Sequence, residues 1–214
     1  KIRLMIQRTN SYYYDQAAFK LKIQVNRAYI VKNIQTLMLG FFEKKLESFG
    51  KNTQIYLNPE DLDEPSQKIY AFLMKYTFSK DWQKDGEIYS ECLDDFFDLN
   101  VSLPNDYTEF KTDEKDIKLV IKLVEYDDCF ELNVDLDDNF LIGNKHLYVA
   151  DYKNITRYTL DADGFLASLA YNVSQEDGWL IKKSDFRAFY LQCLQPYMDY
   201  IQLNTNVAVE KYTT

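Results

Sequence analysis

An uninterrupted alternation of apolar and polar residues runs through Phe19-Lys20-Leu21-Lys22-Ile23-Gln24-Val25. Successive side chains of a β-strand point to opposite faces, so this period of two predicts a strand with one buried and one solvated face. A short break at Asn26-Arg27 follows, and residues 28–32 return to a strand-forming pattern. Residues 19–32 are therefore predicted to form a β-hairpin whose core-facing side chains are Phe19, Leu21, Ile23 and Val25.

Helical spacing follows this hairpin. Asn33 is a typical N-cap residue, and the apolar positions after it predict a helix that ends near Lys44-Lys45. Ser66 is a second candidate cap, for an amphipathic helix that reaches Tyr76. The other elements expected in this half are a strand over residues 2–7, an extended segment over residues 46–57 and a short helix over residues 91–99.

The clearest turn signal in the chain is Pro104-Asn105-Asp106. We place a soft boundary there, between a subdomain of residues 1–103 with the basic hairpin and helices and a subdomain of residues 104–214 with a β-meander and C-terminal helices. A single domain remains an alternative. The expected fold class is α+β, with antiparallel sheets or hairpins and several amphipathic helices.

The second half predicts short strands joined by hairpin-length loops. The expected strands are residues 117–125, 129–134, 139–142, 147–150, 155–159 and 179–181. Asp161 or Asp163 is expected to cap one helix and Ser184 the last helix, which Pro196 should bend or end. The tail after Leu203 is expected to fray.

The charge of the chain is unevenly distributed. Lys1 through Asn52 carry 10 basic and 3 acidic residues, a net of +7, and the rest carry 15 and 31, a net of −16, which sum to −9. One interpretation is two solvated faces of opposite sign. The other is a basic surface for a polyanion and an acidic surface for a protein. The candidate contact residues, beside the tyrosines at positions 12–14, are Lys20, Lys22, Arg27, Lys32, Lys44, Lys45 and Lys51.

Motifs for common chemistries are missing from the sequence. It has no phosphate-binding Gly-x-x-x-x-Gly-Lys-Ser/Thr pattern and no Rossmann glycine pattern. The only histidine is His146, the three cysteines are far apart, and the acidic loops lack the residues of a calcium loop. We therefore predict no catalytic residue, no metal and no cofactor for this chain. A hydrolase that uses carboxylates stays open, because sequence spacing does not give distances in space.

Cellular location is inferred from cysteine usage and hydropathy. An odd number of unpaired cysteines, Cys92, Cys129 and Cys193, is typical of a reducing compartment. The sequence contains no apolar run of the roughly 20 residues that span a bilayer, and no signal peptide. We expect a cytoplasmic protein without a membrane partner. The first residue is lysine rather than methionine, so we also expect the sequence to be part of a longer chain.

A known family shares several of these segments, which are Leu21-Lys22-Ile23, the run Arg27-Ala28-Tyr29-Ile30-Val31-Lys32-Asn33-Ile34, Phe49-Gly50-Lys51-Asn52, Tyr56-x-x-Pro59 and Ile69-Tyr70-Ala71-Phe72-Leu73. Together they resemble the helicase-associated domain of bacterial SWI/SNF-type helicases. The resemblance is specific over about residues 19–75 and looser beyond. Proteins of this family often carry a SWIM zinc finger and a helicase motor, whose residues do not occur in this sequence.

The resemblance implies a non-catalytic accessory domain of an ATP-dependent DNA helicase or translocase. Its partners would be the motor domains of the same chain and possibly DNA, and it would dock on the motor or guide DNA into it. The alternative is a protein–protein interaction module that makes no contact with nucleic acid. ATP hydrolysis would belong to the parent protein.

Overall fold

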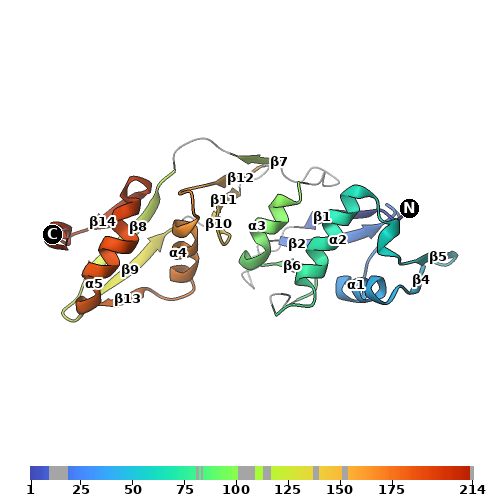
Figure 1. The fold of residues 1–214 in the computed structure, drawn as a ribbon, viewed down its shortest axis with the longest axis horizontal. Helices are drawn as coiled ribbons and strands as arrows, with labels where there is room; N and C mark the ends of the chain where they lie inside the picture. The colour runs from blue at the N-terminus through green and yellow to red at the C-terminus, as the bar shows by residue number, and fades with distance from the viewer. Residues whose placement is uncertain are drawn as a thin grey trace. The chain divides into compact units, whose positions relative to one another are not determined.

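The computed structural model describes most of the chain in two compact units, Lys1–Glu109 and Phe110–Thr214 (Figure 1). The described residues are 1–9, 19–80, 82, 84–100, 109–112, 117–136, 140–150 and 154–212. In both units strands and helices pack together with mainly antiparallel pairing, so the predicted α+β class is confirmed. The boundary predicted between residues 103 and 104 lies outside the described residues and stays a prediction.

The sheet of unit 1 is built around strand β2 (Phe19–Val25). Its antiparallel neighbours are β1 (Leu4–Thr9), β3 (Tyr29–Ile30) and β6 (Glu87–Ile88). The predicted hairpin and its buried apolar face are confirmed, with Ile23 and Val25 fully buried. The returning strand β3 is only two residues long, and β1 supplies most of the pairing of β2 instead.

Helices cover the apolar face of this sheet. They are α1 (Ile34–Glu43), α2 (Glu64–Tyr76) and α3 (Ser90–Asp98). The ring of Phe19 lies 5.9 Å from that of Phe96 and 5.7 Å from that of Phe97, which places α3 on this face. Strand β1 of the sheet packs against α2. Figure 1 shows the helices lying against the strands of this sheet.

The ends of the helices follow local side-chain chemistry. Asn33 caps α1 as predicted, since its side chain accepts a hydrogen bond of 2.7 Å from the N–H of Thr36. The prediction that Ser66 caps α2 is wrong. Asp63 is the cap, accepting from the N–H of Ser66 at 3.0 Å, because Pro65 in the first turn allows the helix to begin earlier. Ser66 is buried, and its hydroxyl accepts a hydrogen bond of 2.8 Å from the N–H of Leu4.

The segment predicted to be extended forms a two-stranded hairpin of β4 (Leu46–Phe49) and β5 (Thr53–Tyr56). One face of this hairpin contacts the rest of unit 1. There the hydroxyl of Tyr29 donates to that of Thr53 at 2.8 Å, and the ring of Phe49 lies 5.7 Å from the ring of Tyr29. The other face carries Leu46 opposite Tyr56, and both are exposed.

The strands of unit 2 form two sheets rather than one meander. One sheet has the order β13-β9-β8-β14, and its strands are β8 (Leu119–Glu125), β9 (Cys129–Asp135), β13 (Trp179–Lys182) and β14 (Ile201–Thr205). The other has the order β10-β11-β12-β7, with β7 (Glu109–Thr112), β10 (Phe140–Ile142), β11 (Leu147–Ala150) and β12 (Asn154–Tyr158). The predicted meander therefore describes only β10-β11-β12. Strand β14 pairs parallel to β8.

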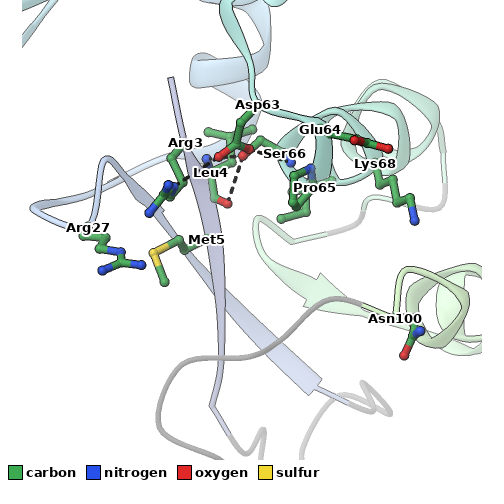
Figure 2. A pocket seen from close by; sticks show the side chains of 11 residues that line it. Arg3, Leu4, Met5, Arg27, Asp63, Glu64, Pro65, Ser66, Lys68 and Asn100 are labelled. Atoms are coloured by element: carbon green, nitrogen blue, oxygen red, sulfur yellow. Dashed lines mark hydrogen bonds and ion pairs between the residues drawn. The ribbon is translucent and has the colours of Figure 1, made fainter. Parts of the chain in front are cut away.

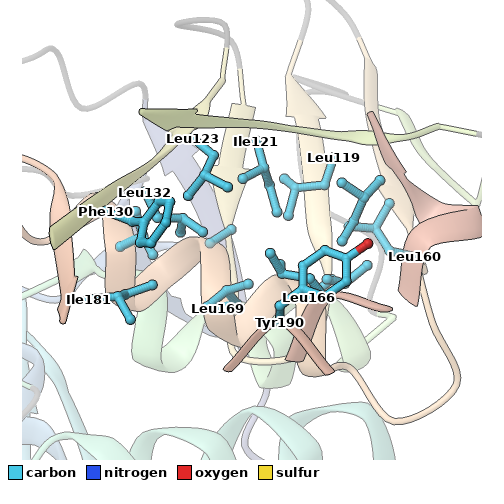
Figure 3. Packing of buried hydrophobic residues seen from close by; sticks show 14 of the residues in the cluster. Leu119, Ile121, Leu123, Phe130, Leu132, Leu160, Leu166, Leu169, Ile181 and Tyr190 are labelled. Carbon is cyan, nitrogen blue, oxygen red and sulfur yellow. The ribbon is translucent and has the colours of Figure 1, made fainter. Parts of the chain in front are cut away.

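The core of unit 2 lies between the first of these sheets and helices α4 (Phe165–Ser174) and α5 (Lys183–Phe189) (Figure 3). The rings of Phe130 and Phe186 stack at 3.9 Å. The N-cap position of α4 is Gly164 rather than the predicted Asp161 or Asp163, but both carboxylates accept a hydrogen bond from the N–H of Phe165 at the helix start. The cap predicted at Ser184 is wrong, since α5 begins at Lys183 without a side-chain cap.

Regular structure continues after α5 in the described residues, which reach Tyr212. A π-helical turn (Tyr190–Leu194) and a 3-10 helix (Gln195–Tyr200) continue α5, so regular α-helix ends before Pro196, as that residue predicted. The frayed tail predicted after Leu203 is wrong within the described residues. Strand β14 pairs with β8, and the ring of Tyr212 packs edge-on against Phe186 at 4.8 Å. Apolar contacts with the core hold this segment in place.

The first testable prediction concerns the buried face of β2. Ile23→Ala should lower the free energy of unfolding by about 2–5 kcal/mol, because Ile23 has no exposed surface and its truncation leaves a cavity. Lys22→Ala, one residue earlier on the solvated face, should change it by less than about 0.5 kcal/mol. Urea unfolding followed by circular dichroism measures both. Equal effects of the two substitutions would contradict this assignment of the faces.

Candidate polyanion-binding surface

The face of the unit 1 sheet opposite the helices carries the first group of cations. Lys20 and Lys22 alternate with the buried residues of β2, so both side chains project from this face and are exposed. Two residues along a strand separate them by about 7 Å. Strand register places Gln7 opposite Lys22 and Met5 opposite Gln24 on the same face. We call this surface the open sheet face.

A tight turn places Arg27 at one end of the open sheet face. The N–H of Ala28 donates to the carbonyl of Val25 at 3.3 Å, and the residues between them, Asn26 and Arg27, have φ values of 55° and 64°. This is a type I′ turn, in which the position of Arg27 favours glycine. A side chain in this left-handed conformation costs roughly 1–2 kcal/mol.

Two hydrogen bonds join this turn to the start of the chain. The N–H of Arg3 donates to the side-chain oxygen of Asn26 at 2.8 Å, and the N–H of Asn26 donates to the carbonyl of Arg3 at 2.8 Å. Arg3 itself forms an ion pair with Asp63, with 3.1 Å between Nε and Oδ2. The first strand, the β2–β3 turn and the start of α2 therefore meet at one place.

A pocket of about 550 Å³ lies at this meeting point (Figure 2). Its charged lining consists of the cations Arg3, Arg27 and Lys68 and the carboxylates Asp63 and Glu64. Figure 2 shows Arg3 and Arg27 on one side of the pocket, and Lys68 with Asn100 on the other. Within the described part of the chain, Arg27 and Lys68 take part in no ion pair, so no described carboxylate neutralises their charges.

The ionisation of Asp63 is set by its neighbours. Partial burial of the carboxyl opposes ionisation, but the hydrogen bonds from Ser66 and Arg3 and the charge of Arg3 outweigh burial and lower the pKa of Asp63. Asp63 is therefore a carboxylate at neutral pH. It caps α2 and orients the Arg3 guanidinium at the same time.

The remaining predicted cations lie on other elements of unit 1. Lys44 ends α1 with a φ of 53°, Lys45 forms an ion pair of 2.8 Å with Glu43, and Lys51 lies in the β4–β5 turn beside Gly50. The hydrogen bond to Glu43 raises the pKa of the Lys45 ammonium. We call Lys20, Lys22 and Arg27 the sheet group and Lys44, Lys45 and Lys51 the hairpin group. Lys32 follows β3, is exposed and belongs to neither group.

Sequence reasoning missed two cations of the pocket, Arg3 and Lys68. Each lies far along the chain from Arg27, and only tertiary contacts bring the three together. The alternating pattern at the start of the chain places Arg3 on the polar face of the first strand. This pattern was the one sequence signal that could have included Arg3 among the candidate cations. The tyrosines at positions 12–14 lie outside the described residues.

The carboxylate pair of unit 2 has a structural role. The oxygens of Asp161 accept hydrogen bonds from the N–H groups of Phe165 and Leu166 at 2.8 and 3.1 Å. Burial and the neighbouring Asp163 raise the pKa of Asp161, while the hydrogen bonds that Asp163 receives lower its own. The oxygens of Asp161 are occupied by the helix start, which does not favour the hydrolase alternative.

The described residues contain neither a cluster of metal ligands nor a helix that could span a membrane. There, no three His, Cys, Asp or Glu side chains lie close enough together to hold a metal ion. Nδ1 of His146 lies 3.2 Å from the hydroxyl of Thr159. In the same part of the chain, every helix is too short or too polar to cross a bilayer. The predicted lack of a metal and of a cofactor stays a prediction.

Comparison of the chain with protein-family models, curated proteins and solved structures finds no match in any of the three. The resemblance to helicase-associated domains therefore rests on the sequence segments quoted above and stays an interpretation. The function proposed below is therefore inferred from the charged surface of unit 1.

Asp63 provides a test of the geometry around the pocket. Asp63→Asn keeps a capping oxygen but removes the charge, so it should lower stability at pH 7 by about 0.5–1 kcal/mol. Because the folded-state pKa is lowered, this contribution is present above the unfolded pKa of about 3.9 and is lost as the pH falls through the folded value. Urea unfolding at several pH values should show the difference from wild type vanishing in acid.

A neighbouring carboxylate serves as the control for this experiment. Asp61 is exposed, and its side chain makes no hydrogen bond or ion pair within the described residues. Asp61→Asn should change stability by less than about 0.5 kcal/mol. A difference between Asp63→Asn and wild type that persists unchanged in acid would contradict the pairing of Asp63 with Arg3.

Proposed function

We propose that this chain is a non-catalytic accessory module of a bacterial SWI/SNF-type ATP-dependent DNA translocase, and that unit 1 guides DNA along its open sheet face. The observation that carries the proposal is the placement of Lys20 and Lys22 on the open sheet face, opposite the helices, with Arg27 in the turn at the end of β2. The motor domains of the same polypeptide would supply ATP hydrolysis. The resemblance of residues 19–75 to helicase-associated domains supports this context.

Electrostatics permits local binding in spite of the negative net charge. Unit 1 carries 14 basic and 16 acidic residues, a net of −2, and unit 2 carries 11 and 18, a net of −7. Exposed charges are screened beyond about 8 Å at physiological salt, so distant acids weaken a phosphate contact little. Glu87 lies opposite Lys20 in the strand register and offsets part of the charge of that lysine. It makes Lys22 and Arg27 the stronger contacts.

A second candidate, a protein-interaction module, is favoured by a separate observation. Apolar side chains are exposed on α1 and on the outer face of the β4–β5 hairpin, with exposed fractions of 69% for Phe42, 60% for Leu46 and 49% for Tyr56. Exposed apolar side chains that lie together on a surface are typical of a protein contact. This surface would let unit 1 dock on a motor domain without any contact with nucleic acid.

The two groups of cations allow a matched test of DNA binding. One variant neutralises the sheet group (Lys20→Gln, Lys22→Gln, Arg27→Gln), and the other neutralises the hairpin group (Lys44→Gln, Lys45→Gln, Lys51→Gln). Both lose three positive charges from exposed positions. The sheet variant should bind a short oligothymidine at least about tenfold more weakly than wild type, and the hairpin variant within about threefold. Fluorescence anisotropy at low salt measures each affinity.

The outcomes separate the two candidate functions. The binding constant should fall as the salt concentration rises. The slope of log K against log [salt] should be about −2 to −3 for three or four phosphate contacts on a single strand. Equal losses in both variants would show a general charge effect and contradict the assignment to the open sheet face. A wild-type chain that binds neither single-stranded nor duplex DNA at low salt would overturn the proposal in favour of the protein-interaction module.

A further inference from the structure

We infer that the pocket between the β2–β3 turn and the start of α2 is a phosphate-binding site, in which Arg27 and Arg3 hold one phosphate group of the strand that crosses the open sheet face. This inference rests on the proposed function and deepens it. It names the residues that bind the phosphate most directly. The cations of β2 lead along the sheet to this pocket at its end.

The conformation of Arg27 is the first argument. Arg27 occupies the turn position that favours glycine, with a φ of 64°. An arginine at a hairpin-turn position that favours glycine is kept at a cost in stability, which agrees with a role for its side chain beyond folding. Within the described residues the guanidinium of Arg27 makes no hydrogen bond or ion pair, so no described carboxylate uses its charge.

The arrangement of Arg3 is the second argument. Asp63 engages Nε of Arg3 and fixes the guanidinium, and within the described residues its two terminal nitrogens make no hydrogen bond. A planar guanidinium binds phosphate oxygens through two parallel N–H groups, which a lysine ammonium cannot do. Figure 2 shows Arg3 and Arg27 on the same side of the pocket, where Met5 also lies.

The size and charge of the pocket define what it accepts. Its volume of about 550 Å³ exceeds that of a phosphate group and leaves room for the attached sugar. Three cations and two carboxylates line it, a net of +1, so attraction by the overall field is weak. Direct bonds from the guanidinium groups must therefore supply the affinity. Lys68 lies on the other side of the pocket.

The chain offers a matched pair of variants for the test. Arg27 and Lys44 both have positive φ, both are exposed, and replacement of either by glycine removes one positive charge and relieves the backbone. Arg27→Gly should bind a short oligothymidine about tenfold more weakly than wild type, and Lys44→Gly should bind as wild type does. The melting temperature of both variants should stay the same or rise, which separates lost binding from lost folding.

Competing oligothymidines identify the source of the phosphate group. They carry hydroxyl ends, a 5′-phosphate or a 3′-phosphate, and they displace a labelled strand in the anisotropy assay. A preference for one phosphorylated end that disappears in Arg27→Gly assigns the site to a terminal phosphate. Equal binding of all three, weakened alike in Arg27→Gly, assigns it to an internal phosphodiester. Both results support a phosphate site.

One result overturns the inference and leaves the proposed function intact. It is wild-type affinity in Arg27→Gly together with a loss of affinity in the double variant Lys20→Gln, Lys22→Gln. That combination would place DNA on the open sheet face but outside the pocket. A loss of affinity in Lys44→Gly equal to that in Arg27→Gly would also overturn it, because any single cation would then matter as much as Arg27.

Discussion

The alternation of side chains along β2 is the constraint on which the rest of unit 1 depends. Phe19, Leu21, Ile23 and Val25 must face the helices because their burial forms the core. Because successive side chains of a strand alternate, Lys20 and Lys22 must then project from the opposite face. A shift of the strand register by one residue would exchange these two sets of side chains. The core and the proposed DNA surface are therefore two sides of one strand.

Hydrogen bonds at the start of the chain build the pocket at the end of this sheet face. The N–H of Leu4 bonds to the buried hydroxyl of Ser66, and Arg3 bonds both to Asn26 and to Asp63. These contacts join residues that are 23 to 62 positions apart. They hold the β2–β3 turn against the first turn of α2 and place three cations around one pocket. The apolar outer face of the β4–β5 hairpin is left on a different part of unit 1, available for protein docking.

Local patterns in the sequence predicted local structure well. The alternation over residues 19–25 predicted a strand and its buried face, and Asn33 predicted a helix start. The failures are tertiary. Ser66 has the chemistry of a cap but is buried against β1, and the chain after Leu203 lacks a strong pattern yet pairs parallel to β8. For the same reason sequence reasoning found Arg27, which lies in the hairpin itself, and missed Arg3 and Lys68.

The central claim is that nucleic acid lies on the open sheet face of the native chain. Acetylation of lysines with and without bound oligothymidine, followed by mass spectrometry, tests it without any substitution. The account predicts that bound DNA protects Lys20, Lys22 and Lys68, while Lys44, Lys45 and Lys51 react at the same rate in both samples. Protection of the hairpin group with no protection of Lys20 and Lys22 would contradict it.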